Sequence, residues 1–234
     1  MPSKLYLIPN TLGECEINHV LPSYVVEIIR SVKHFIVEDV RTTRRFLKKV
    51  DSSINIDELE FFTLNKHTSP EEIAGYLTPL KEGFDMGIIS EAGCPAIADP
   101  GADIVRIAQE KNYSVVPLVG PSSILLGLMA SGFNGQSFAF VGYLPIKDNE
   151  RTLRIKQLEK RAHTERQSQI FIETPYRNMK MFEELLSICQ PNTKLCVACD
   201  ITLETEYIKT KSIAEWKRCK VEDLSKRPCI FILY

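Results

Sequence analysis

Two stretches rich in glycine and proline carry the polar residues that could take part in chemistry. Residues 90–101 read Ser-Glu-Ala-Gly-Cys-Pro-Ala-Ile-Ala-Asp-Pro-Gly, and residues 120–123 read Gly-Pro-Ser-Ser. Small side chains let a ligand approach the backbone, and the N–H groups at the start of a helix after residue 121 would face it. Neither stretch has the glycine pattern of a dinucleotide or nucleoside triphosphate site. The alternative is that both are only tight turns.

The elements that must position these stretches alternate between strand and helix. We expect strands at 4–8, 34–37, 59–64, 86–89, 115–118 and 138–141. Helices are expected between them, at 21–32, 41–50, from 69, 101–112 and 121–132. This alternation predicts right-handed crossovers and a largely parallel sheet. In such a sheet ligands bind beyond the carboxyl ends of the strands, which is where both stretches lie.

A break in the pattern at 142–149, rich in Gly, Pro and Asp, predicts a domain boundary. We expect an N-terminal α/β domain at 1–143 with a mainly parallel sheet, closed by the strand at 138–141. A smaller C-terminal α/β domain at 144–234 should have a mixed sheet. Its strands are expected at 168–173, 195–199, 205–210 and 229–234, and its helices at 151–166, 176–189 and 213–218.

The amino-acid composition excludes several classes of function. Of the 234 residues 44% are hydrophobic and 25% charged, which is typical of a soluble globular protein. The net charge is −1, so any nucleic-acid role must rest on a local patch. No apolar run is long enough to span a membrane, and residues 1–10 indicate a strand rather than a signal peptide. We therefore expect a cytoplasmic protein without a membrane partner.

The seven cysteines are odd in number and irregularly spaced, which predicts reduced thiols rather than a disulfide framework. Cys196 and Cys199 form a Cys-x-x-Cys pair. A structural zinc site needs two further ligands, and the histidines lack the required spacing. We expect no metal.

Four motifs, in order along almost the whole chain, carry a family resemblance. The stretch at 90–101 resembles the Ser-Asp-Ala-Gly-Thr-Pro…Asp-Pro-Gly loop of the tetrapyrrole methylase superfamily. The sequences at 38–47 (Glu-Asp-Val-Arg-Thr-Thr-Arg-Arg-Phe-Leu), 173–177 (Glu-Thr-Pro-Tyr-Arg) and 198–202 (Ala-Cys-Asp-Ile-Thr) resemble its branch of small-subunit rRNA cytidine 2′-O-methyltransferases. Glu91, Cys94 and Cys199 depart from the family's Asp, Thr and Arg.

The resemblance implies an S-adenosylmethionine-dependent methyltransferase with the cofactor in a cleft between two α/β domains. The implied cofactor-binding residues are Pro9, Ser90, Glu91, Ala92, Gly93, Pro95, Ile97, Ser122, Ser123, Glu173 and Thr174. Asp39 is the implied catalytic residue, for substrate orientation or proton acceptance. Its alternative role is an ordinary surface ion pair with a nearby arginine.

Five cations within residues 41–49 suit phosphate contacts. The implied substrate-binding residues are Arg41, Arg44 and Arg177. The leading hypothesis is methylation of rRNA at a cytidine ribose 2′-oxygen. The alternatives are a methyltransferase of a tetrapyrrole or other small anionic molecule, and a non-catalytic S-adenosylmethionine-binding regulator. A homodimer is expected because family members commonly pair and the helix at 121–131 is apolar all round.

Overall fold

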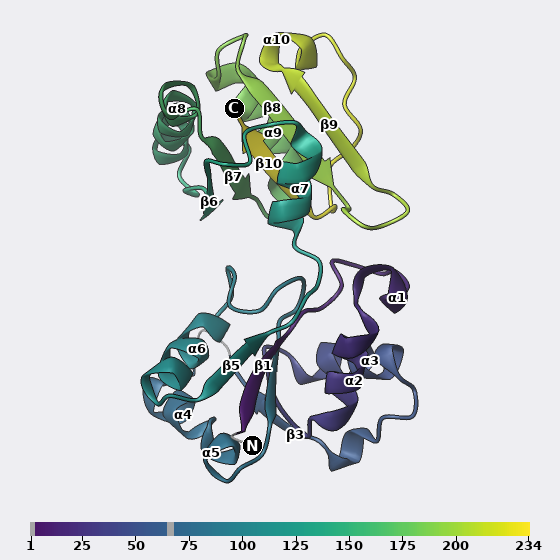
Figure 1. The fold of residues 1–234 in the computed structure, drawn as a ribbon. Coiled ribbons are helices and arrows are strands. Elements are labelled where there is room, and N and C mark those ends of the chain that lie inside the picture. The colour runs from purple at the N-terminus through teal and green to yellow at the C-terminus, as the bar shows by residue number, and fades with distance from the viewer. Residues whose placement is uncertain (1–2, 65–67) are drawn as a thin grey trace. The chain divides into compact units, whose positions relative to one another are not determined.

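The computed structural model describes residues 3–64 and 68–234. Contacts divide the chain into two units, Met1–Ser122 and Ser123–Tyr234. Each unit has its own five-stranded sheet (Figure 1).

The sheet of the first unit is entirely parallel. Its strands are β1 (Lys4–Ile8), β2 (His34–Val37), β3 (Glu60–Thr63), β4 (Met86–Ile89) and β5 (Ser114–Pro117). They lie in the order β3-β2-β4-β1-β5, so all five carboxyl ends meet at one edge. The crossovers contain α1 (Ile17–Val20), α2 (Ser23–Ser31), α3 (Val40–Val50), η1 (Ile56–Glu58), α4 (Pro70–Gly75), α5 (Thr78–Lys81) and α6 (Gly101–Glu110).

Helices cover both faces of this sheet. On one face, Val25 and Ile29 of α2 and Phe46 and Leu47 of α3 pack against side chains such as Phe35 of β2. On the other face, α4, α5 and α6 form a separate apolar cluster with the alternate strand residues. Because strands buried on both faces cannot alternate polar and apolar residues, β4 reads Met-Gly-Ile-Ile, with every residue buried.

The second unit has a mixed sheet in the order β6-β7-β10-β8-β9. Its strands are β6 (Phe138–Tyr143), β7 (Ser168–Ile172), β8 (Lys194–Cys199), β9 (Tyr207–Ser212) and β10 (Cys229–Leu233). Only β6 and β7 pair in parallel; β10 runs antiparallel to both of its neighbours. Its helices are α7 (Ser123–Ser131), α8 (Asp148–Glu165), η2 (Pro175–Arg177), α9 (Asn178–Ile188) and α10 (Ile213–Trp216).

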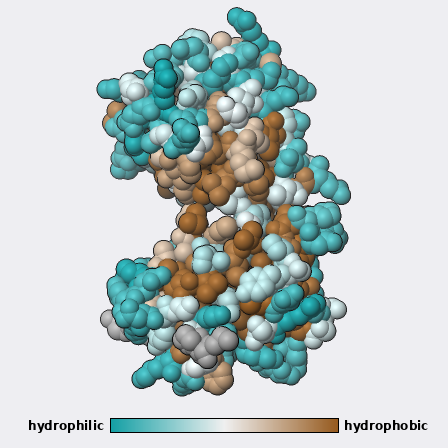
Figure 2. Space-filling view, in the orientation of Figure 1, coloured by the Kyte–Doolittle hydropathy of each residue, from teal (hydrophilic) through white to brown (hydrophobic). Residues whose placement is uncertain are grey.

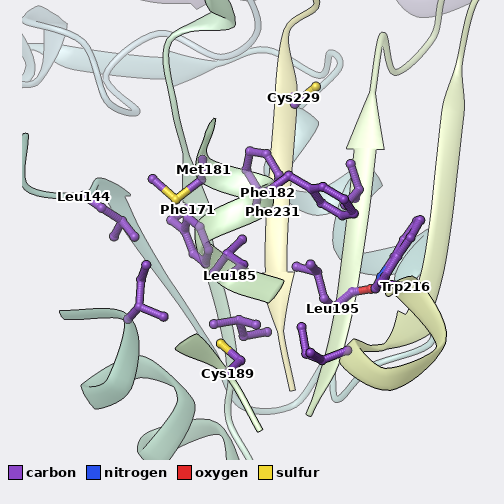
Figure 3. Packing of buried hydrophobic residues seen from close by; sticks show 14 of the residues in the cluster. Leu144, Phe171, Met181, Phe182, Leu185, Cys189, Leu195, Trp216, Cys229 and Phe231 are labelled. Atoms are coloured by element: carbon purple, nitrogen blue, oxygen red, sulfur yellow. The ribbon is translucent and has the colours of Figure 1, made fainter. Parts of the chain in front are cut away.

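Aliphatic and aromatic side chains together form the core of the second unit (Figure 3). The rings of Phe171 and Phe231, on paired strands, stack with their centroids 5.8 Å apart. Trp216 meets Phe182 edge-on at 5.3 Å, and its indole N–H donates to the Leu195 carbonyl at 2.9 Å. That hydrogen bond removes the cost of burying the indole nitrogen.

The predicted fold class is confirmed: a parallel sheet precedes a mixed sheet, and helices accompany both. One strand differs from expectation. The strand at 138–141 was expected to close the first unit, but β6 pairs with β7 and belongs to the second sheet. By contacts α7 also belongs there, so the units divide before the boundary expected at 143/144. No helix in the described part of the chain is long and apolar enough to cross a membrane.

The cysteines correct a second expectation. Cys199 and Cys229 face each other on β8 and β10 and form a disulfide, with their Cα atoms 4.2 Å apart. Sequence spacing could not reveal this pair, because β10 is placed beside β8 only by the fold. Within the described residues no group of three His, Cys, Asp or Glu is placed to hold a metal ion. Cys196 and Cys199 are three residues apart on one strand, so their side chains point to opposite faces.

Candidate functional site

The carboxyl ends of β1 and β4 are joined by Asn10. Its backbone N–H donates to the Gly93 carbonyl at 2.9 Å. Its side-chain Nδ2 donates to the carbonyls of Ser90 and Glu91, at 3.0 and 3.2 Å. Asn10 therefore fixes the turn after β1 against the loop after β4, on which most of the predicted cofactor residues lie.

The loop at 90–101 holds an unusual backbone conformation. Gly93, Ala96 and Ala98 all have left-handed φ angles, of 71°, 65° and 63°. Alanine rarely adopts such angles, and strain of this kind gathers at functional sites. Asp99 stabilises the turn, because its Oδ1 accepts hydrogen bonds from the N–H groups of Ala96 and Gly101, at 2.9 and 2.7 Å.

The loops after β1 and β5 pack closely together. A Cβ added to Gly120 would lie 2.2 Å from Cγ of Pro9, so only glycine fits there. The Cys94 thiol also lies 3.5 Å from the carbonyl oxygen of Pro121. The predicted stretch 90–101 is thus brought together with Pro9 and with Gly120 and Pro121, the first half of the predicted stretch 120–123, at one edge of the sheet.

Asp39 caps α3, as its place after β2 suggested. Its Oδ1 accepts from the Thr42 N–H at 2.9 Å, and this hydrogen bond holds the pKa of Asp39 below its usual value. The Thr42 hydroxyl donates to Oε1 of Glu91 at 2.7 Å. A carboxylate with a lowered pKa is a weaker base, so the geometry favours substrate orientation over proton acceptance for Asp39.

Two carboxyl groups that sequence reasoning did not assign are Asp99, within the loop at 90–101, and Glu38, directly after β2. Glu38 and Asp99 line a small pocket with Ser90 and Gly101, whose volume of about 10 Å³ suits a single water. Burial raises the pKa of both carboxyl groups, and the charge of Asp99 raises that of Glu38 further. Raised pKa values at strand ends are typical of functional sites. Both residues lie within quoted motifs, which was the available signal.

The predicted substrate arginines have different surroundings. Arg41 is exposed in the first turn of α3. The Arg44 guanidinium lies 5.4 Å from the ring centroid of Phe61 on β3. In the second unit, Arg177 forms a 2.6 Å ion pair with Oε2 of the buried Glu173.

The same Glu173 also accepts a hydrogen bond from the Thr174 N–H at 2.7 Å. Each carboxylate oxygen of Glu173 therefore already accepts a hydrogen bond within the second unit. The remaining predicted cofactor residues divide by exposure. Ser90, Pro9, Gly93 and Pro95 are buried, Ser122 and Ser123 are half-buried, and Glu91, Ala92 and Ile97 are exposed.

Solved structures with this fold are methyltransferases. The methyltransferase CobJ has a TM-score of 0.64 at 13% identity, covering 99% of this chain and 92% of that chain. Uroporphyrin-III C-methyl transferase from Thermus thermophilus, complexed with S-adenyl homocysteine, has a TM-score of 0.60 at 16% identity, covering 99% and 97%. These likenesses establish the fold, and no family model matches the chain. In fold and in its four ordered motifs, the chain is similar to the tetrapyrrole methylase superfamily of methyltransferases.

The relatives found by sequence carry a more particular name, ribosomal RNA small subunit methyltransferase I. The protein from Vibrio cholerae is 27% identical over 223 residues, covering 95% of this chain and 73% of that protein. The protein from Streptococcus pyogenes is 29% identical over 229 residues, covering 98% and 75%. The predicted resemblance to the superfamily and its rRNA branch is confirmed, and so is the enzyme class, an S-adenosylmethionine-dependent methyltransferase.

Proposed function

We propose that this enzyme methylates ribosomal RNA of the small subunit, at the ribose 2′-oxygen of a cytidine. Its support is the name shared by the relatives found by sequence, together with the Glu-Asp-x-Arg-x-Thr-Arg motif at 38–44. The structural observation that carries the proposal is the loop at 90–101. It is strained and fixed by Asp99, and it lies against Pro9 and the 120–122 stretch at the strand ends.

The residues of this edge fit S-adenosylmethionine. Ala92 and Ala98 are small and exposed, so the backbone near them is open to a ligand. When bound, the cofactor supplies an activated methyl group. The chain itself has to hold an acceptor oxygen in line with the methyl–sulfur bond, and such positioning lowers the barrier substantially without a strong base. Asp39, fixed at the N-terminus of α3, orients the acceptor hydroxyl by accepting its hydrogen bond.

A direct test measures methyl transfer from labelled S-adenosylmethionine to small ribosomal subunits, to naked rRNA and to a uroporphyrin-type tetrapyrrole. Label in a cytidine ribose of the rRNA supports the proposal. Label only in the tetrapyrrole supports the small anionic substrate, which is favoured by the names of the structural neighbours. Binding of S-adenosylhomocysteine without any transfer would indicate a non-catalytic regulator.

Two variants of Asp39 separate its structural and functional roles. Asp39→Asn keeps an oxygen that can accept from the Thr42 N–H, whereas Asp39→Ala removes it. We expect both variants to transfer methyl groups more slowly and only the alanine variant to melt at a lower temperature. If the asparagine variant keeps the full rate, Asp39 serves only as a helix cap.

Cofactor binding is tested by calorimetry with S-adenosylhomocysteine. Ala92→Trp should abolish binding, because a large ring would fill the approach to the loop. The matched control is Gly135→Ala, since a Cβ at Gly135 meets nothing within 4 Å. Absence of binding to the unaltered protein would contradict the cofactor assignment.

The proposal includes a homodimer in the cytoplasm. Hydrophobic residues gather on the surface of the second unit (Figure 2). In this unit Met129 of α7, Tyr143 at the end of β6 and Ile146 after it are 77%, 61% and 76% exposed. Their burial against a second copy would remove an unfavourable apolar surface from water. Light scattering should give twice 26.6 kDa. A cytoplasmic ribosomal substrate supports the location, which fractionation of cells would test.

A further inference from the structure

A groove of about 610 Å³ lies on the first unit, beside the loop at 90–101. One wall is the turn at 10–14 after β1, and the other is the exposed face of α3. Glu91 and Ala92 close one end. None of the predicted substrate arginines lines it; the cations along it are Arg45 and Lys49.

Hydrogen bonds fix the walls of this groove. Asn10 holds the 10–14 turn to the loop through its bonds to the carbonyls of Ser90, Glu91 and Gly93. The Thr42 hydroxyl ties α3 to the Glu91 carboxylate. Because both walls are tied to the same loop, the groove is formed before any ligand binds, and little ordering would be needed on binding.

The cations of α3 divide between two faces. The Arg44 guanidinium lies over Phe61, and the Lys48 ammonium donates to the Ser52 carbonyl at 2.9 Å. Arg45 and Lys49 instead face the groove, one helical turn apart. No ion pair or hydrogen bond engages the Arg45 side chain within residues 3–64 and 68–234.

Lys49 has a partner that a ligand can replace. Its ammonium lies 2.6 Å from Oε1 of Glu14, whose side chain is 93% exposed. An ion pair with so exposed a carboxylate contributes little, because water and salt screen it. A phosphate that enters the groove can therefore displace Glu14 from the Lys49 ammonium at little cost.

The groove is electrically polarised. Its cationic end holds Arg45 and Lys49, the second of them paired with the exposed Glu14. Its other end holds the Glu91 carboxylate, close to Asp39 through their shared partner Thr42. An anion is favoured at the first end and repelled at the second. A ribose, whose hydroxyls donate hydrogen bonds, suits the carboxylate end.

We propose that this groove binds the sugar-phosphate backbone of the RNA substrate next to the methylated nucleotide. Arg45 and Lys49 contact successive phosphates, and the acidic end directs the ribose toward Asp39. The inference rests on the proposed function for the identity of the substrate. It transfers the phosphate contacts from the expected pair, Arg41 and Arg44, to the groove-facing pair, which sequence spacing alone could not distinguish.

The test compares three double variants that each remove two positive charges. Arg45→Gln/Lys49→Gln alters the groove, and Arg44→Gln/Lys48→Gln alters the other face of α3. Lys81→Gln/Lys111→Gln is the matched control, at the ends of α5 and α6 on the opposite face of the sheet. RNA binding is measured against salt concentration with an oligonucleotide carrying the methylation site. Each lost contact to a single strand should flatten the slope of log K against log salt by about 0.7, so the groove variant should lose about 1.4.

Methyl transfer gives a second readout. The groove variant should raise KM for RNA much more than it lowers kcat, and its affinity for S-adenosylhomocysteine and its melting temperature should not change. Glu14→Gln should act in the opposite direction and tighten RNA binding, because it releases Lys49 from its partner. A merely structural role for these side chains would not produce that gain.

The inference is overturned if the groove variant keeps the slope of the unaltered protein, or if the Arg44/Lys48 variant or the matched control loses as much. Failure of the proposed function has a different signature. If the unaltered enzyme labels no rRNA but its RNA binding depends on Arg45 and Lys49, the groove does bind RNA and the proposed methylation of rRNA is wrong. If rRNA is labelled and the groove variant is normal, the reaction stands and the groove does not. If the unaltered protein binds no RNA at all, both are wrong.

Discussion

Gly120→Ala tests whether the packing of the strand-end loops sets the stability of the first unit and its cofactor affinity. The added Cβ would lie 2.2 Å from Cγ and 2.3 Å from Cβ of Pro9, whereas real Cβ contacts essentially never fall below 3.0 Å. The third neighbour, Cδ2 of Leu21, is 3.3 Å away and flexible. The proline ring must therefore retreat by about 0.8 Å to reach even the closest distance that Cβ atoms show.

Pro9 cannot retreat easily, because it directly follows β1, which is hydrogen-bonded on both sides by β4 and β5. Overpacking of this kind typically costs about 1–3 kcal/mol. For a unit of this size, we expect the melting temperature to fall by about 4 °C per kcal/mol. Since the same shift displaces the turn after β1 from the loop at 90–101, affinity for S-adenosylhomocysteine should also fall.

Thermal unfolding and calorimetry with S-adenosylhomocysteine measure the two effects. Gly75→Ala is the matched control, since it lies in the same unit and a Cβ there meets nothing within 4 Å. We expect the control to be neutral or slightly stabilising. If Gly120→Ala melts and binds like the control, the close approach to Pro9 does not constrain the loops, and the reasoning is refuted.

Three further predictions concern single features of the two units. Burial raises the pKa of Asp99, so the folded state loses stability as the pH rises from the carboxyl group's usual pKa of 3.8 through the raised value. Asp99→Asn should weaken this pH dependence in thermal melts and leave the loop intact. Replacing Cys199 and Cys229 together by Ala opens a covalent loop of 30 residues, which should lower the free energy of unfolding by about 3.5 kcal/mol in denaturant titrations without reductant. With reductant present, the substitutions should have less effect. Arg151→Gln leaves Glu184 without its ion-pair partner at 2.5 Å, an arginine whose side chain is only 3% exposed. We expect the free energy of unfolding to fall by about 3 kcal/mol in the same titration. An unchanged midpoint would show that the pair is dispensable.

Local signals predicted the elements well. The helix expected from residue 69 is present and begins with a capping box formed by Ser69 and Glu72, and β2 and β4 have the expected bounds. These features depend on neighbouring residues, so sequence alone contains them. Strand β6 was assigned to the wrong sheet because an apolar strand reads the same whichever partner it pairs with.

The candidate site was predicted in part, because sequence locates the strand ends but not the contacts that the fold creates. The glycine- and proline-rich stretches and Asp39 lie at the strand ends, because strand order places successive βα turns together. The direction in which each side chain points could not be predicted from the sequence. Spacing on α3 could not show that Arg44 lies over Phe61 while Arg45 faces the groove, nor that Glu173 is engaged by Arg177.

The position of β10 has a consequence for synthesis on the ribosome. This strand lies in the middle of the second sheet, where it pairs with both β7 and β8, although it comes after every other strand of that sheet in the chain. Until residues 229–233 have been translated, β7 and β8 lack their shared neighbour and expose unpaired edges, which are prone to aggregation. The first unit has all five of its strands by residue 117 and can fold much earlier. The chain should therefore fold in two stages, with its second unit dependent on protection until β10 has been translated.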